Sequence, residues 1–271
     1  MYNREESYRH MPVKNSVSLG ALLLLTAAVP LSGQWLDLKD KIPRNKDGSA
    51  NFDAPLPPRR ADGHPDLTGI WIAQPSRLHD ATAGLKPEDV EILPAYAQLF
   101  AERKSGDRAN EDPDAHCLPQ GVPKIHQTPL PFKILQEPNL VVILYEAFGQ
   151  YRQIFLDGRP LPADPNPQWF GYSIGKWEGD TLVVQSNGFN GKAWLDQAGH
   201  PTSEALRTTE RYHRTAFGRL EITTTIDDPD VYKKPWTVVQ PAVLFPDTDL
   251  LEHVCNENNK DLEHLKGKTN P

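Results

Sequence analysis

The chain has 271 residues, and its 36 acidic against 29 basic residues give a formal net charge of −7. This balance argues against nucleic acids and anionic membrane surfaces as partners, because both attract basic surfaces. Hydrophobic residues make up 38% and charged residues 24% of the chain, a composition that allows a folded core rather than a disordered protein.

The first 33 residues have the pattern of a secretion signal. An apolar run from Ser18 to Val29 follows Arg9 and Lys14 and precedes small residues that end at Gly33. The run is shorter than the roughly 20 residues that span a bilayer, so a retained membrane anchor is the weaker alternative. We expect an exported protein, periplasmic or extracellular.

Two methionines can start this signal. Met1 precedes a charged stretch, whereas Met11 opens a conventional leader with the sequence MPVKNS. Cleavage after Gly33 leaves 238 residues with 26 basic and 34 acidic side chains, a net charge of −8. This length fits one domain with a proper core.

The mature part begins without a strong periodic pattern. Residues 34–66 are rich in Pro, Lys, Arg and Asp and predict an extended, flexible arm. A strand is expected at Leu67–Ala73 and a helix near 87–103, with Pro87 in its first turn and Pro94 kinking or dividing it. Residues 105–131 are Pro-rich and irregular.

From Phe132 onward, short strands alternate with turns. Short turns separate the members of four strand pairs, which are hairpin candidates: 132–136 with 140–148, 169–177 with 181–186, 206–215 with 219–226, and 236–245 with 250–255. The expected strands are 132–136, 140–148, 151–156, 169–177, 181–186, 206–215, 219–226, 236–245 and 250–255.

These strands, with one N-terminal helical segment, predict a mainly β domain from residue 67 to 271. A large antiparallel sheet must curl or close to protect its edges, so we expect an up-and-down barrel or a strongly curved sandwich, lipocalin-like or calycin-like. The triplet Gly69-Ile70-Trp71 is similar to the Gly-x-Trp signature of lipocalin-like barrels.

The two cysteines of the sequence, Cys117 and Cys255, both lie in the exported part. In an oxidising compartment such a pair favours a disulfide. A metal pair with His116 and His253 is the alternative, but no Cys-x-x-Cys or His-x-x-x-His spacing supports zinc.

Seven stretches of the chain together resemble a large family of exported bacterial proteins of unestablished function. They are PDLTGIW, HCLPQGVP, IFLDGRPLP, GYSIGKWEGDTLVVQSNGFN, GHPTSEALRTTERYHR, DDPDVYKKPW and LLEHVCNENNKD, and they are spread over the region from Pro65 to His264. The resemblance implies an exported protein and brings no reaction with it.

The segment from Phe189 to Arg214 gathers the residues best suited to chemistry. His200 with Asp196, Glu204 or Glu210 can act as a general base and its partner. Trp194 can supply an apolar wall for a ligand at the mouth of a barrel. The alternative is a capped turn with solvated acids.

Ser173 lies in Gly171-Tyr172-Ser173-Ile174-Gly175, which matches the Gly-x-Ser-x-Gly pattern of serine hydrolases. The serine stands inside an expected strand, whereas a nucleophile elbow must lead from a strand into a helix. We therefore interpret Tyr172 and Ser173 as ligand-facing residues rather than as a catalytic elbow.

The strand Leu206–Arg214 places Glu210 and Tyr212 on one face, and Arg211 and His213 on the other. Both faces are mixed, so the inward one stays open. If Glu210 faces inward, it needs a partner such as a neighbouring arginine, or has a raised pKa and a task.

Near the C-terminus, Glu257 and Asn258 follow Cys255 and either point into a site or cap a terminal turn. No dinucleotide or phosphate-binding glycine motif is present, and Asp227–Asp230 lacks EF-hand spacing, so we expect no cofactor or metal.

Two functions follow. The first is binding of a small, partly apolar molecule in the barrel interior or rim, with Trp194, Tyr172, Ser173, Tyr212, Glu257 and Asn258 as candidate contacts. The second is a cofactor-free lyase, isomerase or hydrolase in which His200 works with Asp196, Glu204 or Glu210.

Overall fold

A computed structural model describes residues 38–257 and 259–260 of the chain. The expected signal segment, the alternative start at Met11 and the candidate residue Asn258 lie outside these described residues.

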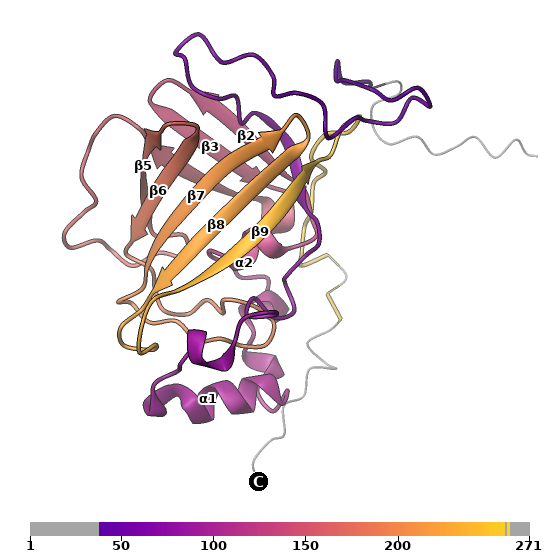
Figure 1. Ribbon diagram of the computed structural model, residues 1–271. Helices are drawn as coiled ribbons and strands as arrows, with labels where there is room; N and C mark the ends of the chain where they lie inside the picture. Colours follow the sequence, from indigo (N-terminus) through magenta and orange to yellow (C-terminus); the bar gives the residue numbers. More distant parts are fainter. Residues whose placement is uncertain (1–37, 258, 261–271) are drawn as a thin grey trace, which may run out of the picture. The chain divides into compact units, whose positions relative to one another are not determined.

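The described chain forms nine strands that close into a barrel in the order of the sequence (Figure 1). The prediction of a mainly β barrel is therefore confirmed. The strands are β1 (Gly69–Ala73), β2 (Phe132–Glu137), β3 (Leu140–Tyr145), β4 (Gln150–Phe155), β5 (Tyr172–Glu178), β6 (Thr181–Asn187), β7 (Arg207–Ala216), β8 (Arg219–Asp227) and β9 (Trp236–Leu244).

One strand pair departs from the expected antiparallel pattern. β4 and β5 are parallel and share only the pairs Ile154–Ser173 and Phe155–Ile174. The chain just before β5 instead follows the end of β6, where Gln168 bridges Phe189. The first half of β4 therefore has no strand partner on its β5 side among the described residues, and the barrel wall is open there.

In residues 38–257, helical structure is confined to short segments outside the barrel wall. The predicted division at Pro94 is confirmed, because the longest helix begins at that proline, whose missing N–H is tolerated in a first turn. The helices are α1 (Pro94–Lys104) and α2 (Lys124–Gln127), with 3-10 turns at Pro87–Asp89, Ala109–Glu111, Pro113–His116 and Ala147–Gly149. Figure 1 shows α2 at the lower end of the barrel and α1 below it.

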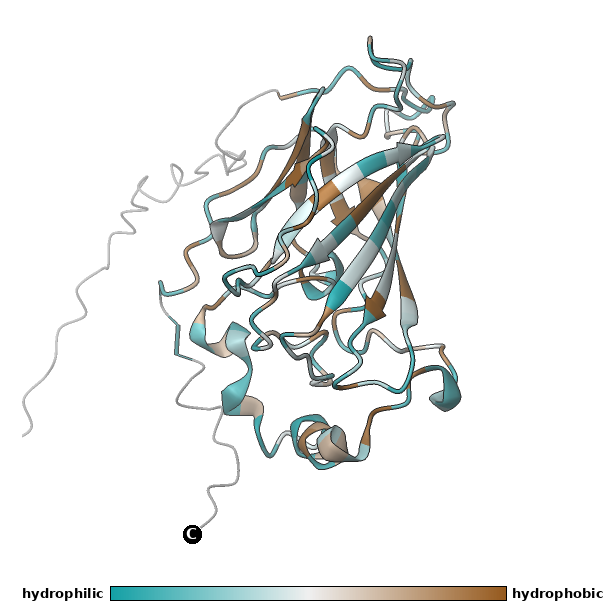
Figure 2. Cartoon of the chain, turned by 90° about the vertical axis from the view of Figure 1, so that its left-hand side faces the viewer, coloured by the Kyte–Doolittle hydropathy of each residue, from teal (hydrophilic) through white to brown (hydrophobic). Residues whose placement is uncertain are grey.

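The barrel interior is filled by one apolar cluster. Alternate residues of each strand face inward, and Figure 2 shows the resulting change between apolar and polar residues along the strands. Its largest buried side chains include Trp71, Phe132, Ile143, Ile154 and Tyr212. The interior is therefore a packed core over most of its length.

The expected last strand, Leu250–Cys255, is wrong. β9 pairs with β1 at Trp71–Leu244 and Ala73–Ala242 and so closes the barrel, which leaves no edge for a further strand. Side-chain contacts hold the following segment instead, for example from Lys133 to Asp249 at 2.9 Å.

Residues 38–66, expected as an extended arm, pack over the end of the barrel that carries the β5–β6 and β7–β8 turns (Figure 1). Phe52 packs against Gly218 of the β7–β8 turn, and Asp53 forms an ion pair with Arg219. Arg44 bonds Asp247 at 2.5 Å.

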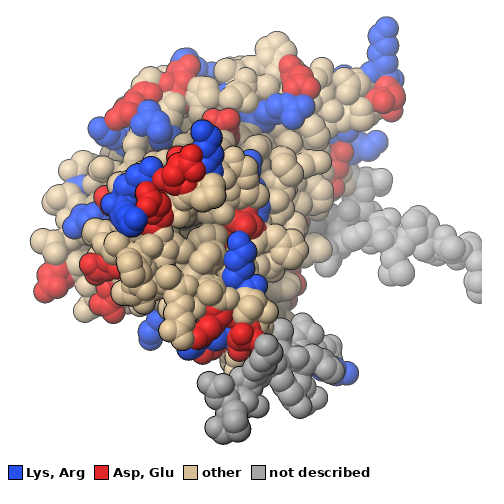
Figure 3. Space-filling model, turned by 60° about the horizontal axis from the view of Figure 1, so that its bottom comes forward, with Lys and Arg blue, Asp and Glu red and all other residues tan. Residues whose placement is uncertain are grey.

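Charges of both signs are interspersed on the face of the molecule that carries α1 (Figure 3). A face of this kind presents no continuous basic patch to a polyanion.

Candidate ligand-binding site

A buried ion pair lies inside the barrel next to the opening between β4 and β5. Arg152 of β4 donates from Nη1 to Glu210 Oε1 of β7 at 3.0 Å, and its Nη2 bonds the second carboxylate oxygen. The same guanidinium donates to Ser173 of β5 at 3.0 Å and to Ser186 of β6 at 2.9 Å. Four strands thus contribute to one polar cluster. The inward face of β7 is the one with Glu210 and Tyr212, and the expected arginine partner is present.

Two tyrosines and a histidine extend this cluster toward α2. The hydroxyl of Tyr212 donates to Glu210 at 3.0 Å. His126 Nε2 lies 2.8 Å from the hydroxyl of Tyr145 and 3.2 Å from that of Tyr212, while its Nδ1 lies 3.4 Å from Glu210 Oε1. The α2 helix therefore places an imidazole on the inner end of the ion pair.

The protonation states in this cluster are fixed around neutral pH. Burial lowers the pKa of His126 to about 4, and burial raises the pKa values of Tyr145 and Tyr212 above their ordinary value. Burial alone would raise the pKa of Glu210, but the charge and hydrogen bonds of Arg152 outweigh it and hold this pKa below its usual value. Glu210 is therefore ionised, and the imidazole and both phenols are neutral.

A pocket of about 920 Å³ opens from the outside onto this cluster. Arg152 and Ser173, each only 3% exposed, line it from the barrel side. Its outer walls come from the 156–171 connection and from the segment between β6 and β7, including Trp169, Phe170 and Lys192. The predicted residues Tyr172, Ser173 and Glu204 all line it, and Glu210 and Tyr212 lie behind its floor. We call it the lateral pocket.

The predicted pair of Asp196 and His200 is formed, but in a different place. His200 Nδ1 lies 2.7 Å from Asp196 Oδ2, and the carboxylate also accepts from the backbone N–H groups of Ala81, Gly199 and His200. Phe100 of α1 covers the imidazole, with ring centroids 4.3 Å apart. Neither residue lines the lateral pocket, so the pair ties a loop to α1.

Close packing explains the glycine beside this pair. Gly199 has a φ of +89°, and a Cβ there would lie 2.4 Å from Cβ of Arg103 on α1.

Asp80 lies close to the Asp196–His200 pair. Asp80, Asp196 and His200 each bring a possible metal-ligand atom within 4.8 Å of the others. Both oxygens of Asp196 already accept hydrogen bonds, which makes the group a loop anchor rather than an open metal centre.

Ser173 has no catalytic partner of the serine hydrolase kind. Its hydroxyl contacts Arg152 Nε and the hydroxyl of Ser186, each at 3.0 Å. Among the residues that the structure describes, no histidine bonds Ser173. This agrees with its position within a strand.

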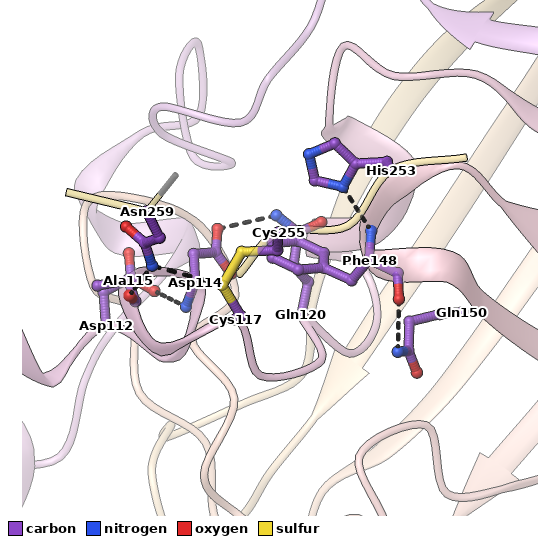
Figure 4. The surroundings of a disulfide bond; sticks show 10 residues. All are labelled: Asp112, Asp114, Ala115, Cys117, Gln120, Phe148, Gln150, His253, Cys255 and Asn259. Atoms are coloured by element: carbon purple, nitrogen blue, oxygen red, sulfur yellow. Dashed lines mark hydrogen bonds between the residues drawn. A yellow bond between two sulfur atoms is a disulfide. The ribbon is translucent and has the colours of Figure 1, made fainter. Parts of the chain in front are cut away.

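The predicted disulfide is present between Cys117 and Cys255, and the metal alternative is thereby excluded. Figure 4 shows the bond with its surroundings, where His253 Nδ1 accepts from the backbone N–H of Phe148 at 3.2 Å. A second pocket of about 700 Å³ lies beside it and is lined by Trp194, Glu257 and Cys255, among others. Trp194 and Glu257 are thus separated from the lateral-pocket residues.

Sequence reasoning missed Arg152, Tyr145, His126 and Lys192. Arg152 had a usable signal, because it alternates with Ile154 in a strand that is otherwise mostly uncharged and apolar on that face. His126 had none, because it lies in a Pro-rich stretch without periodicity.

The fold and the pocket define a closed β-barrel with a lateral opening. No family model and no curated protein matches the chain. Among solved structures, a crystal structure of a point mutant of the fluorescent protein UnaG is similar at 14% identity and a TM-score of 0.30. The match covers 68% of this chain and 97% of that one.

Proposed function

We propose that this protein binds a small, partly apolar molecule in the lateral pocket. The observation that supports this is that Arg152 and Ser173 belong to the buried cluster and also line the pocket. Burying an ion pair inside a barrel costs desolvation free energy that apolar side chains would not incur. A role of this ion pair at the floor of a ligand-binding pocket would account for the desolvation free energy.

A neutral fluorescent probe tests the proposal. N-phenyl-1-naphthylamine is expected to bind the full chain saturably, with one site and an increase in fluorescence. Gln153→Trp adds bulk at an exposed position of the lateral pocket. It is expected to raise the dissociation constant of the probe about tenfold.

The matched control is Gln197→Trp, which adds the same bulk at an exposed position of the second pocket. It is expected to leave the dissociation constant unchanged. An effect of Gln197→Trp without an effect of Gln153→Trp would move the site to the second pocket, and absence of saturable binding would refute the proposal.

We further propose that the protein is exported and belongs to the family of exported bacterial proteins that it resembles. The pattern of the first 33 residues supports export, as does the Cys117–Cys255 disulfide, because such bonds persist in oxidising compartments. N-terminal sequencing of the protein from a periplasmic fraction tests this, with a start at residue 34 as the expected result. The helices that the structure describes are too short or too polar to span a bilayer.

A second candidate function is acid–base catalysis by His200. The 2.7 Å contact with Asp196 orients the imidazole as a general base requires. Incubation of a metabolite mixture with wild type and with His200→Ala tests it, with thermal melts to show that the variant is folded. Identical product profiles from two folded proteins would exclude this role.

A further inference from the structure

The floor of the lateral pocket has no spare cation to offer an anionic ligand. A guanidinium has five N–H donors, and Arg152 directs them to Ser173, Ser186, Tyr212 and both oxygens of Glu210. An anion would have to replace one of these buried partners. The floor is therefore charge-balanced and suits a ligand without net charge.

The walls of the pocket are rich in aromatic rings. Phe155, Trp169, Phe170 and Tyr172 all line it. Phe170 already stacks on Tyr145, with ring centroids 5.8 Å apart and an interplanar angle of 12°, and the Arg159 guanidinium lies 3.8 Å from the centroid of Phe155. Planar groups thus stack at this site in the free protein, and a planar ligand can extend the stack.

Two charges at the pocket have no partner among the residues that the structure describes. Lys192 and Glu204 both line it, and neither side chain has a hydrogen bond or ion pair there. They lie on neighbouring stretches of one loop, because a Cβ on Gly191 would be 3.0 Å from the carbonyl carbon of Ser203 and 3.1 Å from N of Glu204. A cation and an anion on two adjacent chain segments of one pocket can donate to and accept from one hydroxyl group of a ligand.

We propose that the ligand is a planar aromatic compound without net charge that carries a hydroxyl group. Its ring stacks on the aromatic wall, and its hydroxyl accepts from Lys192 and donates to Glu204. This inference rests on the proposed function and names the ligand class for the same pocket. A long acyl chain fits less well, because the described barrel interior beyond the floor is filled by side chains such as Ile143 and Ile154.

Four small probes separate the ligand classes in calorimetric titrations of the full chain. They are 1-naphthol, its isostere 1-methylnaphthalene, the anion 1-naphthoate and the acyclic alcohol 1-decanol. We expect 1-naphthol to bind about tenfold more tightly than each of the other three. Tightest binding of 1-naphthoate or 1-decanol would overturn the proposed class.

Substitutions assign the contacts. The double variant with Lys192→Ala and Glu204→Ala is expected to remove the preference for 1-naphthol over 1-methylnaphthalene without weakening 1-methylnaphthalene. Trp169→Ala is expected to weaken both aromatic probes about tenfold. Lys234→Ala, at an exposed lysine outside the pocket, is the control and is expected to leave the affinity for 1-naphthol and for 1-methylnaphthalene unchanged.

The two proposals fail in different ways. If N-phenyl-1-naphthylamine binds at the lateral pocket but the double variant keeps the full preference for 1-naphthol, the ligand class is wrong and the binding function stands. If none of the probes binds saturably, the binding function itself is refuted.

Discussion

Glu210 and Asp196 are both fully buried carboxylates, each held by several hydrogen bonds and each close to a histidine. Their surroundings differ. The partners of Glu210 are side chains of β4, β7 and α2, and one of them, Arg152, lines a pocket. The partners of Asp196 are mostly backbone N–H groups of its own loop and of Ala81. Burial and pairing alone therefore do not distinguish the two carboxylates, whereas the position of Glu210 behind the lateral pocket does.

The comparison predicts the largest loss of stability for Glu210→Ala. Removal of one partner leaves the Arg152 charge buried and uncompensated, which costs about 3 to 5 kcal/mol of the free energy of unfolding. Urea denaturation measures this. The double variant with Arg152→Met and Glu210→Leu is the control and is expected to lose much less, because it leaves no unpaired charge. A loss as large as that of the single variant would contradict this account.

Asp196→Ala is expected to cost less, about 2 to 3 kcal/mol, because it leaves neutral backbone N–H groups rather than a buried charge without a partner. The variant leaves the N–H groups of Ala81, Gly199 and His200 without their acceptor. Its affinity for N-phenyl-1-naphthylamine is expected to stay at the wild-type value, since Asp196 does not line the lateral pocket. If the folded Asp196→Ala variant binds the probe more weakly than wild type, the claim that only the Glu210 cluster lies at the binding site is contradicted.

Acidification is expected to destabilise the Glu210 cluster through His126. The unfolded chain protonates this imidazole near pH 6.5, whereas the folded protein does so only near its pKa of about 4. The unfolded state therefore binds more protons between these values, and stability falls as the pH drops from 6.5 to 4. Between pH 7 and pH 5 the loss is about 2 kcal/mol.

Urea denaturation at both pH values measures this loss. His126→Gln keeps hydrogen-bonding groups next to Tyr145 and Tyr212 but does not titrate, so it is expected to lack most of this pH dependence. An unchanged slope in His126→Gln would assign the effect to another group.

The smallest effect is expected on the surface. Arg211 is the outward neighbour of Glu210 on β7 and bonds Glu178 at 3.1 Å, with both side chains substantially exposed. Exposed ion pairs of this kind contribute little because water and salt screen them. Arg211→Ala is expected to leave the urea midpoint and the probe affinity unchanged. A clear shift in either would show that the outward face of β7 also contributes to stability or to probe binding.

Much of the barrel could be predicted from local patterns, because alternation and turn residues indicate a strand at each of the positions of β1 to β9. Local patterns also explain the wrong strand at Leu250–Cys255, since closure of the sheet by β1 and β9 is not visible in either segment alone.

The lateral pocket was harder to predict for the same reason. It exists because β4 and β5 run parallel and part after two residue pairs, a long-range arrangement. Glu210 could be singled out as needing a partner, but its inward orientation was left open by a strand with two mixed faces. Only the packing of Tyr212 and Arg152 in the interior decides it.

The disulfide also has a consequence for the order of events during synthesis. Cys117 is made 138 residues before Cys255, an interval of roughly 7 to 28 s at ordinary rates of elongation. All strands from β2 to β9 are added in that time, and the sequence contains no other cysteine with which Cys117 can pair wrongly. The intramolecular bond can therefore close only after every strand of the barrel has been synthesised, so its formation reports a chain that contains all nine strands.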